Sequence, residues 1–295
     1  MPRYAAIDVG TNSVLLLVAE RDAAGRWQPV LERAEITRLG KGVDQSKRLA
    51  PEAIETTVKC LEAFASEARG LGAKGIVTSA TSAARDASNG REFLEAAKGR
   101  AGLDIEIIAG EEEARLSYAS AHADFGGQHP LIVLDIGGGS TEFIYGTREG
   151  EVQFRHSFDV GSVRMTERFD GDAPKIREHL KATFSALPEP PPNARLIGVA
   201  GTVTTVLTVS RAIDPYDASK VHGATMPRAE VSAVTQKLLS LDLEARKKLP
   251  GLQPKRADVI PAGGLILEAA MEAVNATELV VSDRGLRWGL LADRF

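Results

Sequence analysis

The fold is decided by one short stretch, VLDIGGGSTE at residues 133–142. An apolar run ends at Asp135 and Ile136, three glycines and a serine follow, and a second apolar run begins at Phe143. Apolar runs on both sides of a glycine-rich turn are typical of two β-strands joined by a tight turn. The stretch therefore predicts a hairpin whose turn exposes backbone and few side chains.

The same pattern occurs a second time, near the start of the chain. AIDVGTNS at residues 6–13 aligns with VLDIGGGS at residues 133–140 without a gap, and an apolar run follows each copy. An internal repeat of this kind indicates two units built on one plan. The turn residues 124–127 precede the second copy, so we expect domains at residues 1–125 and 126–295.

Each half continues with short β-like runs that alternate with helical apolar spacing. This alternation favours an α/β fold with a largely parallel sheet in each half. The pattern predicts strands at residues 75–79, 104–108, 152–158 and 196–199, and helices at 51–69, 91–98, 111–121, 162–169, 173–186, 229–239 and 264–274.

Composition excludes several classes of protein. The chain has 295 residues, a net charge of −4 and a single cysteine, so neither an internal disulfide nor a thiolate zinc cluster is expected. The near-neutral charge argues against a large nucleic-acid surface, and we expect neither a membrane span nor a signal segment. We expect a cytoplasmic protein. Glycine is abundant, since 28 of the 295 residues are glycine. This share is roughly 9.5%, whereas the average in proteins is about 7%.

The two glycine-rich turns are candidate phosphate sites. Successive backbone N–H groups that face one concavity bind phosphate oxygens, and glycine lets a ligand approach the backbone closely. One such turn alone would be equally typical of an ordinary hairpin, but two copies favour phosphate. The candidate binding residues are Thr11, Asn12 and Ser13 in the first copy and Gly138, Gly139, Ser140 and Thr141 in the second, with Gly201 and Thr202 in a further strand-to-helix turn.

An aspartate precedes each turn, at Asp8 and Asp135. A carboxylate beside a phosphate is repulsive unless a cation lies between them, so these residues suggest Mg²⁺ or another divalent cation. The alternative is that each aspartate caps its own turn. The copies differ at one charged position, because Glu142 of the second aligns with Leu15 of the first. Glu142 therefore favours the second turn as the site of metal or water activation.

These motifs resemble the exopolyphosphatase and guanosine pentaphosphate phosphohydrolase family, within the actin, sugar kinase and heat-shock ATPase superfamily. The resemblance covers nearly the whole chain and is carried by AAIDVGTNS (5–13), TSATSAARDASN (78–89), AGEEEAR (109–115), DIGGGSTE (135–142), VGSVRMTE (160–167), VAGTVTT (199–205), VHG (221–223), DVIPAGG (258–264) and SDRGLRWG (282–289). It implies an α/β fold with two ribonuclease-H-like domains around a central cleft, in the short form without additional carboxy-terminal domains.

The resemblance also implies roles for individual residues. Glu113 matches the glutamate that activates water, Asp135 and Glu142 match acidic residues that support metal and water, and Arg85 matches an arginine that reaches the phosphate. From the residues alone, the run Glu111 to Glu113 would also suit the positive end of a helix, and a lone arginine is more often at the surface. His222 would suit the cleft or a structural role equally well.

The expected function is Mg²⁺-dependent hydrolysis of a terminal phosphoanhydride, with inorganic polyphosphate as the first choice of substrate. Two alternatives remain open. One is removal of the 5′ γ-phosphate of guanosine pentaphosphate, and the other is a non-catalytic sensor that binds guanosine tetra- or pentaphosphate. The resemblance also implies a homodimer.

Overall fold

The computed structural model describes residues 1–295, and the chain forms two compact units. The first unit comprises Met1–Leu116 and Leu286–Phe295, and the second comprises Ser117–Gly285. This division differs from the expected boundary after residue 125. It falls inside helix α5 (Gly110–Phe125), because Ser117 bonds to a strand of the second unit, and the chain ends with a helix that belongs to the first.

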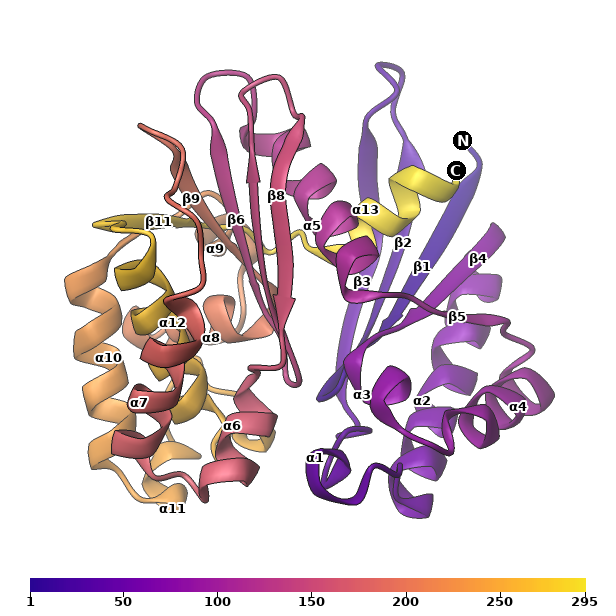
Figure 1. Ribbon diagram of the computed structural model, residues 1–295. Helices are drawn as coiled ribbons and strands as arrows, with labels where there is room; N and C mark the ends of the chain where they lie inside the picture. Colours follow the sequence, from indigo (N-terminus) through magenta and orange to yellow (C-terminus); the bar gives the residue numbers. More distant parts are fainter. The chain divides into compact units, whose positions relative to one another are not determined.

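The first unit contains a five-stranded sheet in the order β3-β2-β1-β4-β5 (Figure 1). Strands β1, β2 and β3 are antiparallel neighbours, whereas β4 runs parallel to β1 and β5 runs parallel to β4. The carboxyl ends of β1, β4 and β5 therefore meet at one edge of the sheet. The strands are β1 (Arg3–Val9), β2 (Ser13–Arg21), β3 (Trp27–Ile36), β4 (Ala73–Ala80) and β5 (Ile105–Ile107).

Successive side chains of β1 pack in two different cores, because neighbouring residues on a strand point to opposite faces of the sheet. Ala5 and Ile7 pack in a cluster with buried residues of α2 (Pro51–Gly70) and α4 (Gly90–Ala101). Ala6 packs instead with fully buried leucines of α13 (Leu286–Arg294). The first sheet is thus covered on both faces, and α13, the last helix, closes one of them.

The second unit contains a six-stranded sheet in the order β10-β11-β9-β6-β7-β8. Leaving out β10, this is the order of the first sheet, and again two strand pairs, here β6 with β9 and β9 with β11, are parallel beside antiparallel strands. The ribonuclease-H-like prediction is confirmed in each unit by this shared topology. The strands are β6 (Leu131–Ile136), β7 (Thr141–Gly146), β8 (Val152–Phe158), β9 (Arg195–Val199), β10 (Thr225–Pro227) and β11 (Glu278–Val281).

The helices of the second unit bury one face of its sheet in the largest core of the protein. Leu134 and Phe143 on β6 and β7 join buried residues from six helices in that cluster. The helices are α6 (Ser162–Phe169), α7 (Ala173–Phe184), α8 (Ala200–Ser210), α9 (Ala218–Val221), α10 (Arg228–Ser240) and α12 (Ile260–Ala273).

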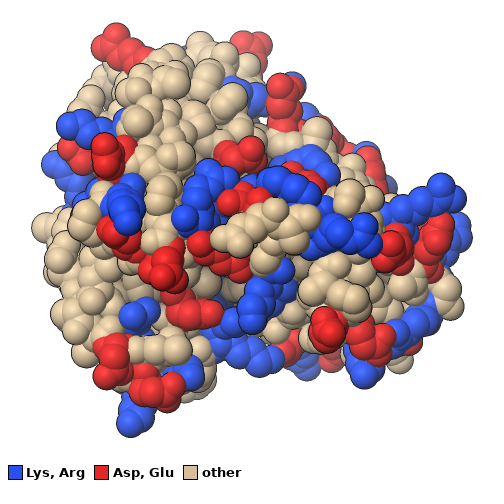
Figure 2. Space-filling view, turned by 60° about the horizontal axis from the view of Figure 1, so that its bottom comes forward, with Lys and Arg blue, Asp and Glu red and all other residues tan.

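The predicted elements form, with boundaries that shift by a few residues; β8 and α6 match the expected ranges. Strands β3 and β11 and helix α13 were not predicted. No helix combines the length and the apolar character that crossing a membrane requires. On the face shown in Figure 2, acidic and basic side chains are interspersed and do not separate into fields of one sign.

Candidate active site

The glycine turn of the second unit is bound to the start of α6 by its carbonyl groups. The turn closes with a bond from Gly137 N to Ser140 O at 3.0 Å. Ser162 N donates to Gly137 O (3.1 Å) and Val163 N to Gly138 O (2.9 Å). The Nε of Arg164 then donates to Gly139 O at 2.6 Å. All three glycine carbonyls thus point toward α6.

The direction of these carbonyls sets the direction of the amides. In a trans peptide the N–H points opposite to the preceding C=O. The N–H groups of Gly138, Gly139 and Ser140 therefore project away from α6, on the opposite side of the turn. Three successive donors on one side form an anion-binding nest. Gly138, Gly139 and Ser140, three of the predicted phosphate residues, thus present their backbone amides on one side of the turn.

The turn and α6 approach each other closely at Gly161. A Cβ at this position would lie 2.4 Å from the carbonyl carbon of Gly138 and from Gly139 N, closer than real contacts allow. Glycine is therefore required there for the carbonyls to reach the helix. Thr141, also a predicted phosphate residue, is fully buried in β7 and its hydroxyl donates to Val160 O at 2.6 Å. Its side chain thus supports the turn from behind.

The turn of the first unit repeats this construction with a different support. Gly10 N bonds to Ser13 O at 2.9 Å, like its counterpart in the second copy. Here the carbonyls are held by the loop after β3, since Gly40 N donates to Thr11 O (2.8 Å) and Arg38 N to Asn12 O (2.9 Å). The amide of Asn12 consequently points away from that loop. Sequence reasoning missed the loop, because β3 carries no clear alternation.

The two acidic residues of the second hairpin lie side by side. Asp135 on β6 pairs directly with Glu142 on β7, and both are buried. Hydroxyl groups hold one oxygen of each: Ser117 Oγ donates to Asp135 Oδ2 and Ser157 Oγ to Glu142 Oε1, both at 2.6 Å. Burial raises the pKa of Asp135 above its ordinary value, and the bond from Ser117 partly offsets this rise.

This donor set fits a hard divalent cation. Two ionised carboxylates buried as neighbours repel each other, and a cation between them removes the repulsion. The hydroxyls of Ser117 and Ser157 orient the carboxylates in the way that outer partners orient metal ligands. No group of three or more His, Cys, Asp or Glu side chains is placed to hold a metal ion. The protein would therefore offer a cation here two carboxylates, Asp135 and Glu142.

Asp8, the counterpart of Asp135, has different neighbours. It pairs with Leu15 across the hairpin and with Ser79 on the parallel strand β4. The expected difference between the copies is thus present in the register: where the second hairpin sets a carboxylate opposite its aspartate, the first sets a leucine. Asp8 by itself offers a single carboxylate.

Arg85 and Glu113 form a pair at the same edge of the first sheet. Arg85 lies on α3 (Ser82–Asp86), after β4, and its Nη1 donates to Ile108 O at 3.0 Å. The same atom lies 3.7 Å from Glu113 Oε2. Of the three successive glutamates in the first turn of α5, Glu111 is exposed and Glu112 is bound to Arg115, while Glu113 is buried. Glu113 alone of the three thus combines burial with a partner at the strand ends.

The third predicted anion turn lies at the start of α8. Because β9 runs parallel to β6 and Val199 pairs with Asp135, this turn and the glycine turn share one edge of the second sheet. Gly201 lies against the guanidinium of Arg256, which was not predicted from the sequence. A Cβ on Gly201 would be 2.4 Å from Nη1 of Arg256. Thr202 is buried, and its methyl group packs against Gly263 of α12.

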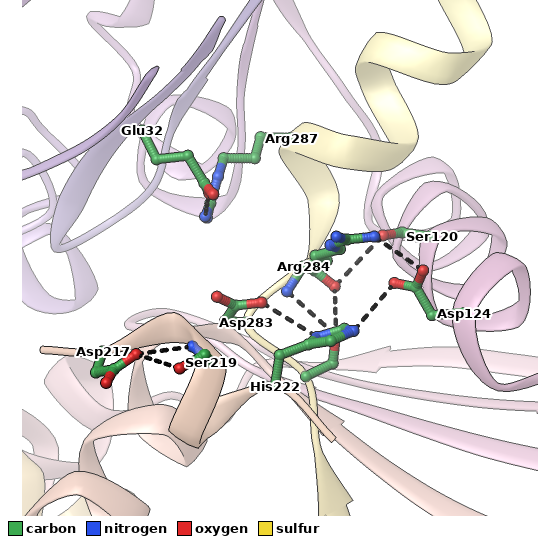
Figure 3. A network of polar contacts seen from close by, with 10 residues as sticks. Glu32, Ser120, Asp124, Asp217, Ser219, His222, Asp283, Arg284 and Arg287 are labelled. Carbon is green, nitrogen blue, oxygen red and sulfur yellow. Dashed lines mark hydrogen bonds and ion pairs between the residues drawn. The ribbon is translucent and has the colours of Figure 1, made fainter. Parts of the chain in front are cut away.

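His222 belongs to a polar network that links three segments of the second unit (Figure 3). Its Nδ1 lies 3.1 Å from Asp283 Oδ1, and its Nε2 lies 3.6 Å from Asp124 Oδ2. Arg284 completes the network with a bond of 3.0 Å to Asp124. Both ring nitrogens face carboxylates, so the geometry favours the structural role for His222.

Comparison with known proteins identifies the family. The model of the Ppx/GppA phosphatase family matches residues 17–295. Exopolyphosphatase 2 of Mycobacterium tuberculosis is 35% identical over 313 aligned residues, which cover 98% of each chain. The chain therefore belongs to the Ppx/GppA phosphatase family, which confirms the resemblance and the expectation of a phosphatase.

Solved structures agree with this placement. A Ppx/GppA family member from Aquifex aeolicus is 32% identical and superimposes with a TM-score of 0.82, covering 99% of this chain and 97% of that one. An exopolyphosphatase-like protein is 31% identical, with a TM-score of 0.89 over 99% of this chain and 97% of the other. The predicted α/β fold class is thus confirmed.

Proposed function

We propose that this protein is an exopolyphosphatase, which releases orthophosphate from the end of inorganic polyphosphate. The observation that carries the proposal is the second hairpin, where a nest of three amides adjoins a buried pair of carboxylates, Asp135 and Glu142. Amides bind phosphate oxygens without a charged side chain, and the carboxylates suit a divalent cation. The similarity to exopolyphosphatase 2 over the full length of both chains supports the same substrate class.

The reaction is the attack of water on the terminal phosphorus. The bond from phosphorus to the bridging oxygen breaks, the shortened chain keeps that oxygen, and orthophosphate leaves. This chemistry requires positioning and charge stabilisation more than covalent participation by the protein. Accordingly, the amides of Gly138, Gly139 and Ser140 bind and orient phosphoryl oxygens.

Glu113 is assigned to the attacking water, whose proton its carboxylate accepts. Its burial and its place in the first turn of α5 support this role, because a general base must be held in place beside the water that it activates. Arg85, within 3.7 Å of Glu113, is assigned to a phosphate oxygen. Thr11, Asn12 and Ser13, together with Gly201 and Thr202, are assigned to phosphate groups further along the substrate.

Asp135 and Glu142 are the residues that would hold Mg²⁺. We assign Asp8 as a further ligand of a divalent cation. When bound, a divalent cation neutralises negative charge on the phosphoryl oxygens. The backbone amides and Arg85 do not neutralise this charge by themselves, because the transferred phosphoryl group carries several negative charges.

The proposal is tested by phosphate release from three substrates: long-chain polyphosphate, short-chain polyphosphate and guanosine pentaphosphate. Each is measured with Mg²⁺ and after its removal by EDTA, on protein whose oligomeric state is determined by light scattering. We expect release from polyphosphate that requires Mg²⁺. If phosphate is released from guanosine pentaphosphate alone, the protein is a guanosine pentaphosphate phosphohydrolase. If it binds guanosine tetraphosphate and hydrolyses none of the substrates, it is a non-catalytic sensor. Either result would overturn the proposal.

A further inference from the structure

We propose that Arg164 is a positioning residue that fixes the orientation of the Gly139–Ser140 peptide for phosphate binding and turnover. The inference rests on the proposed function and concerns a residue outside the motifs assigned to catalysis. Arg164 lies in the first turn of α6 and is only 6% exposed. Burying a guanidinium is costly unless it forms good hydrogen bonds, and the bond that this one makes to Gly139 O is short, at 2.6 Å.

The three peptides of the turn are held in unequal ways. The carbonyls of Gly137 and Gly138 accept bonds from backbone amides of α6, which do not depend on a side chain. The Gly139 carbonyl accepts from the side chain of Arg164. The orientation of the Gly139–Ser140 peptide, and hence of the Ser140 N–H, therefore depends on one side chain.

The glycines of the turn make this dependence important. Glycine reaches most backbone conformations at little cost, so a peptide next to Gly139 rotates readily when its bond to α6 is removed. A rotated peptide would direct the Gly139 carbonyl toward the phosphate and the Ser140 amide away from it. An attractive donor would be replaced by a repulsive acceptor. By its bond to Gly139 O, Arg164 prevents this rotation.

The charge of Arg164 has the same effect on the bound anion. A charged donor makes a hydrogen bond roughly twice as strong as a neutral one, and a positive charge behind the turn adds to the field of the amides. The carboxylate of Asp159 lies 3.7 Å from Nη2 of Arg164 and its side chain is 74% exposed, so solvent weakens this ion pair.

Three variants separate these contributions. Arg164→Met keeps the length of the stem but removes donor and charge, whereas Arg164→Lys keeps both in a different geometry. Arg168→Met, at an exposed position of the same helix, is the matched control. We expect Arg164→Met to lower kcat/KM for polyphosphate by about 100-fold, because loss of one donor to a developing charge costs about that factor. Arg164→Lys should lose about tenfold or less, and Arg168→Met less than about twofold.

The second readout is independent of turnover. Pyrophosphate is added as the probe, and the amide signals of Gly138, Gly139 and Ser140 are followed by ¹⁵N NMR. In the wild type all three should shift, whereas in Arg164→Met the shift of Ser140 should be lost and that of Gly138 retained. Loss of stability alone would not select one amide. If Arg164→Met fails to fold, the same comparison is made with Arg164→Gln, which keeps a neutral donor and should retain part of the Ser140 response.

The possible failures are distinct. Wild-type protein that hydrolyses no polyphosphate defeats the proposed function, while the NMR comparison still tests Arg164. Wild-type protein that hydrolyses polyphosphate, with Arg164→Met as active as Arg168→Met, or with an undiminished Ser140 shift, overturns the inference.

Discussion

Asp135 and Glu142 are direct neighbours across the hairpin of β6 and β7, and both carboxylates are buried. One carboxylate oxygen of each accepts a hydrogen bond from a serine hydroxyl, with an oxygen–oxygen distance of 2.6 Å in both cases. Two buried like charges destabilise the fold unless something opposite in charge lies with them. We therefore expect a divalent cation bound at this pair to stabilise the second unit.

The first prediction follows from this pair. Asp135→Asn should raise the melting temperature in EDTA, because it removes a desolvated charge, and should abolish the rise that Mg²⁺ produces. At about 100 times Kd, a bound cation stabilises the wild type by about 2.7 kcal/mol. Differential scanning calorimetry with and without Mg²⁺ measures both effects, with Glu189→Gln in an exposed loop as the control. A wild type that Mg²⁺ does not stabilise would contradict the metal assignment.

The second prediction concerns Glu113. Glu113→Gln should reduce kcat for polyphosphate by about 10² to 10⁴-fold, the usual contribution of a general base, with KM nearly unchanged. Glu112→Gln is a close control, since Glu112 is bound to Arg115 through two bonds of 2.7 and 2.8 Å. It should retain activity within about twofold. Steady-state phosphate release decides the matter, and equal kcat values for the two variants would remove Glu113 from the mechanism.

The third prediction separates Arg85 from Glu113. Arg85→Ala should raise KM for polyphosphate by about tenfold, equivalent to roughly 1.4 kcal/mol, since the arginine is assigned to a phosphate oxygen. Arg91→Ala removes an exposed arginine that pairs with Glu95 and should leave KM unchanged. Wild-type values of both KM and kcat in Arg85→Ala would show that Arg85 has a structural role alone, through its contacts with Ile108, Asp86 and Glu113.

The hairpins could be predicted from the sequence because their signals are local. An apolar run, a glycine-rich turn and a second apolar run specify strand, turn and strand, and a turn of known length fixes the register. That Asp135 and Glu142 lie opposite each other was not predicted, because it depends on the residue at which each strand meets the turn. The domain boundary was less accessible, because the pattern of α5 is continuous through residue 116.

The supports of the turns could not be predicted, because they are distant in sequence. Arg164 follows Gly139 by 25 positions, and the loop that holds Asn12 follows a strand with irregular exposure. Ser117 and Ser157, which bond to the carboxylates, lie 18 and 15 positions away from them in the chain. The candidate phosphate and metal residues could be found from local motifs in the sequence. The residues that orient them could not, because they come close only in the tertiary structure.

The fourth prediction uses a strained residue beside the anion turn of α8. Ala200 has a φ of 70°, a left-handed conformation that a Cβ disfavours. Ala200→Gly should therefore stabilise the protein by about 1 kcal/mol. Ala182→Gly, at an exposed position in α7, should instead destabilise it by about 0.5–1 kcal/mol. Urea denaturation measures both. Destabilisation of the same size in both variants would show that Ala200 carries no strain.

The fifth prediction is a pH dependence that arises from His179 on α7. Burial, with a smaller contribution from Arg168, lowers the pKa of His179 below the ordinary histidine value of 6.5. Because the unfolded chain then binds the proton more tightly than the folded one, the contribution of this residue is present above about pH 6.5 and is lost as the pH falls toward the lowered pKa. His179→Gln should therefore lose less stability than the wild type between about pH 7.5 and pH 5.5. Urea unfolding at both pH values measures the difference, and His129→Gln, at an exposed position, should behave like the wild type. Equal losses in wild type and His179→Gln would show that His179 is protonated equally in the two states.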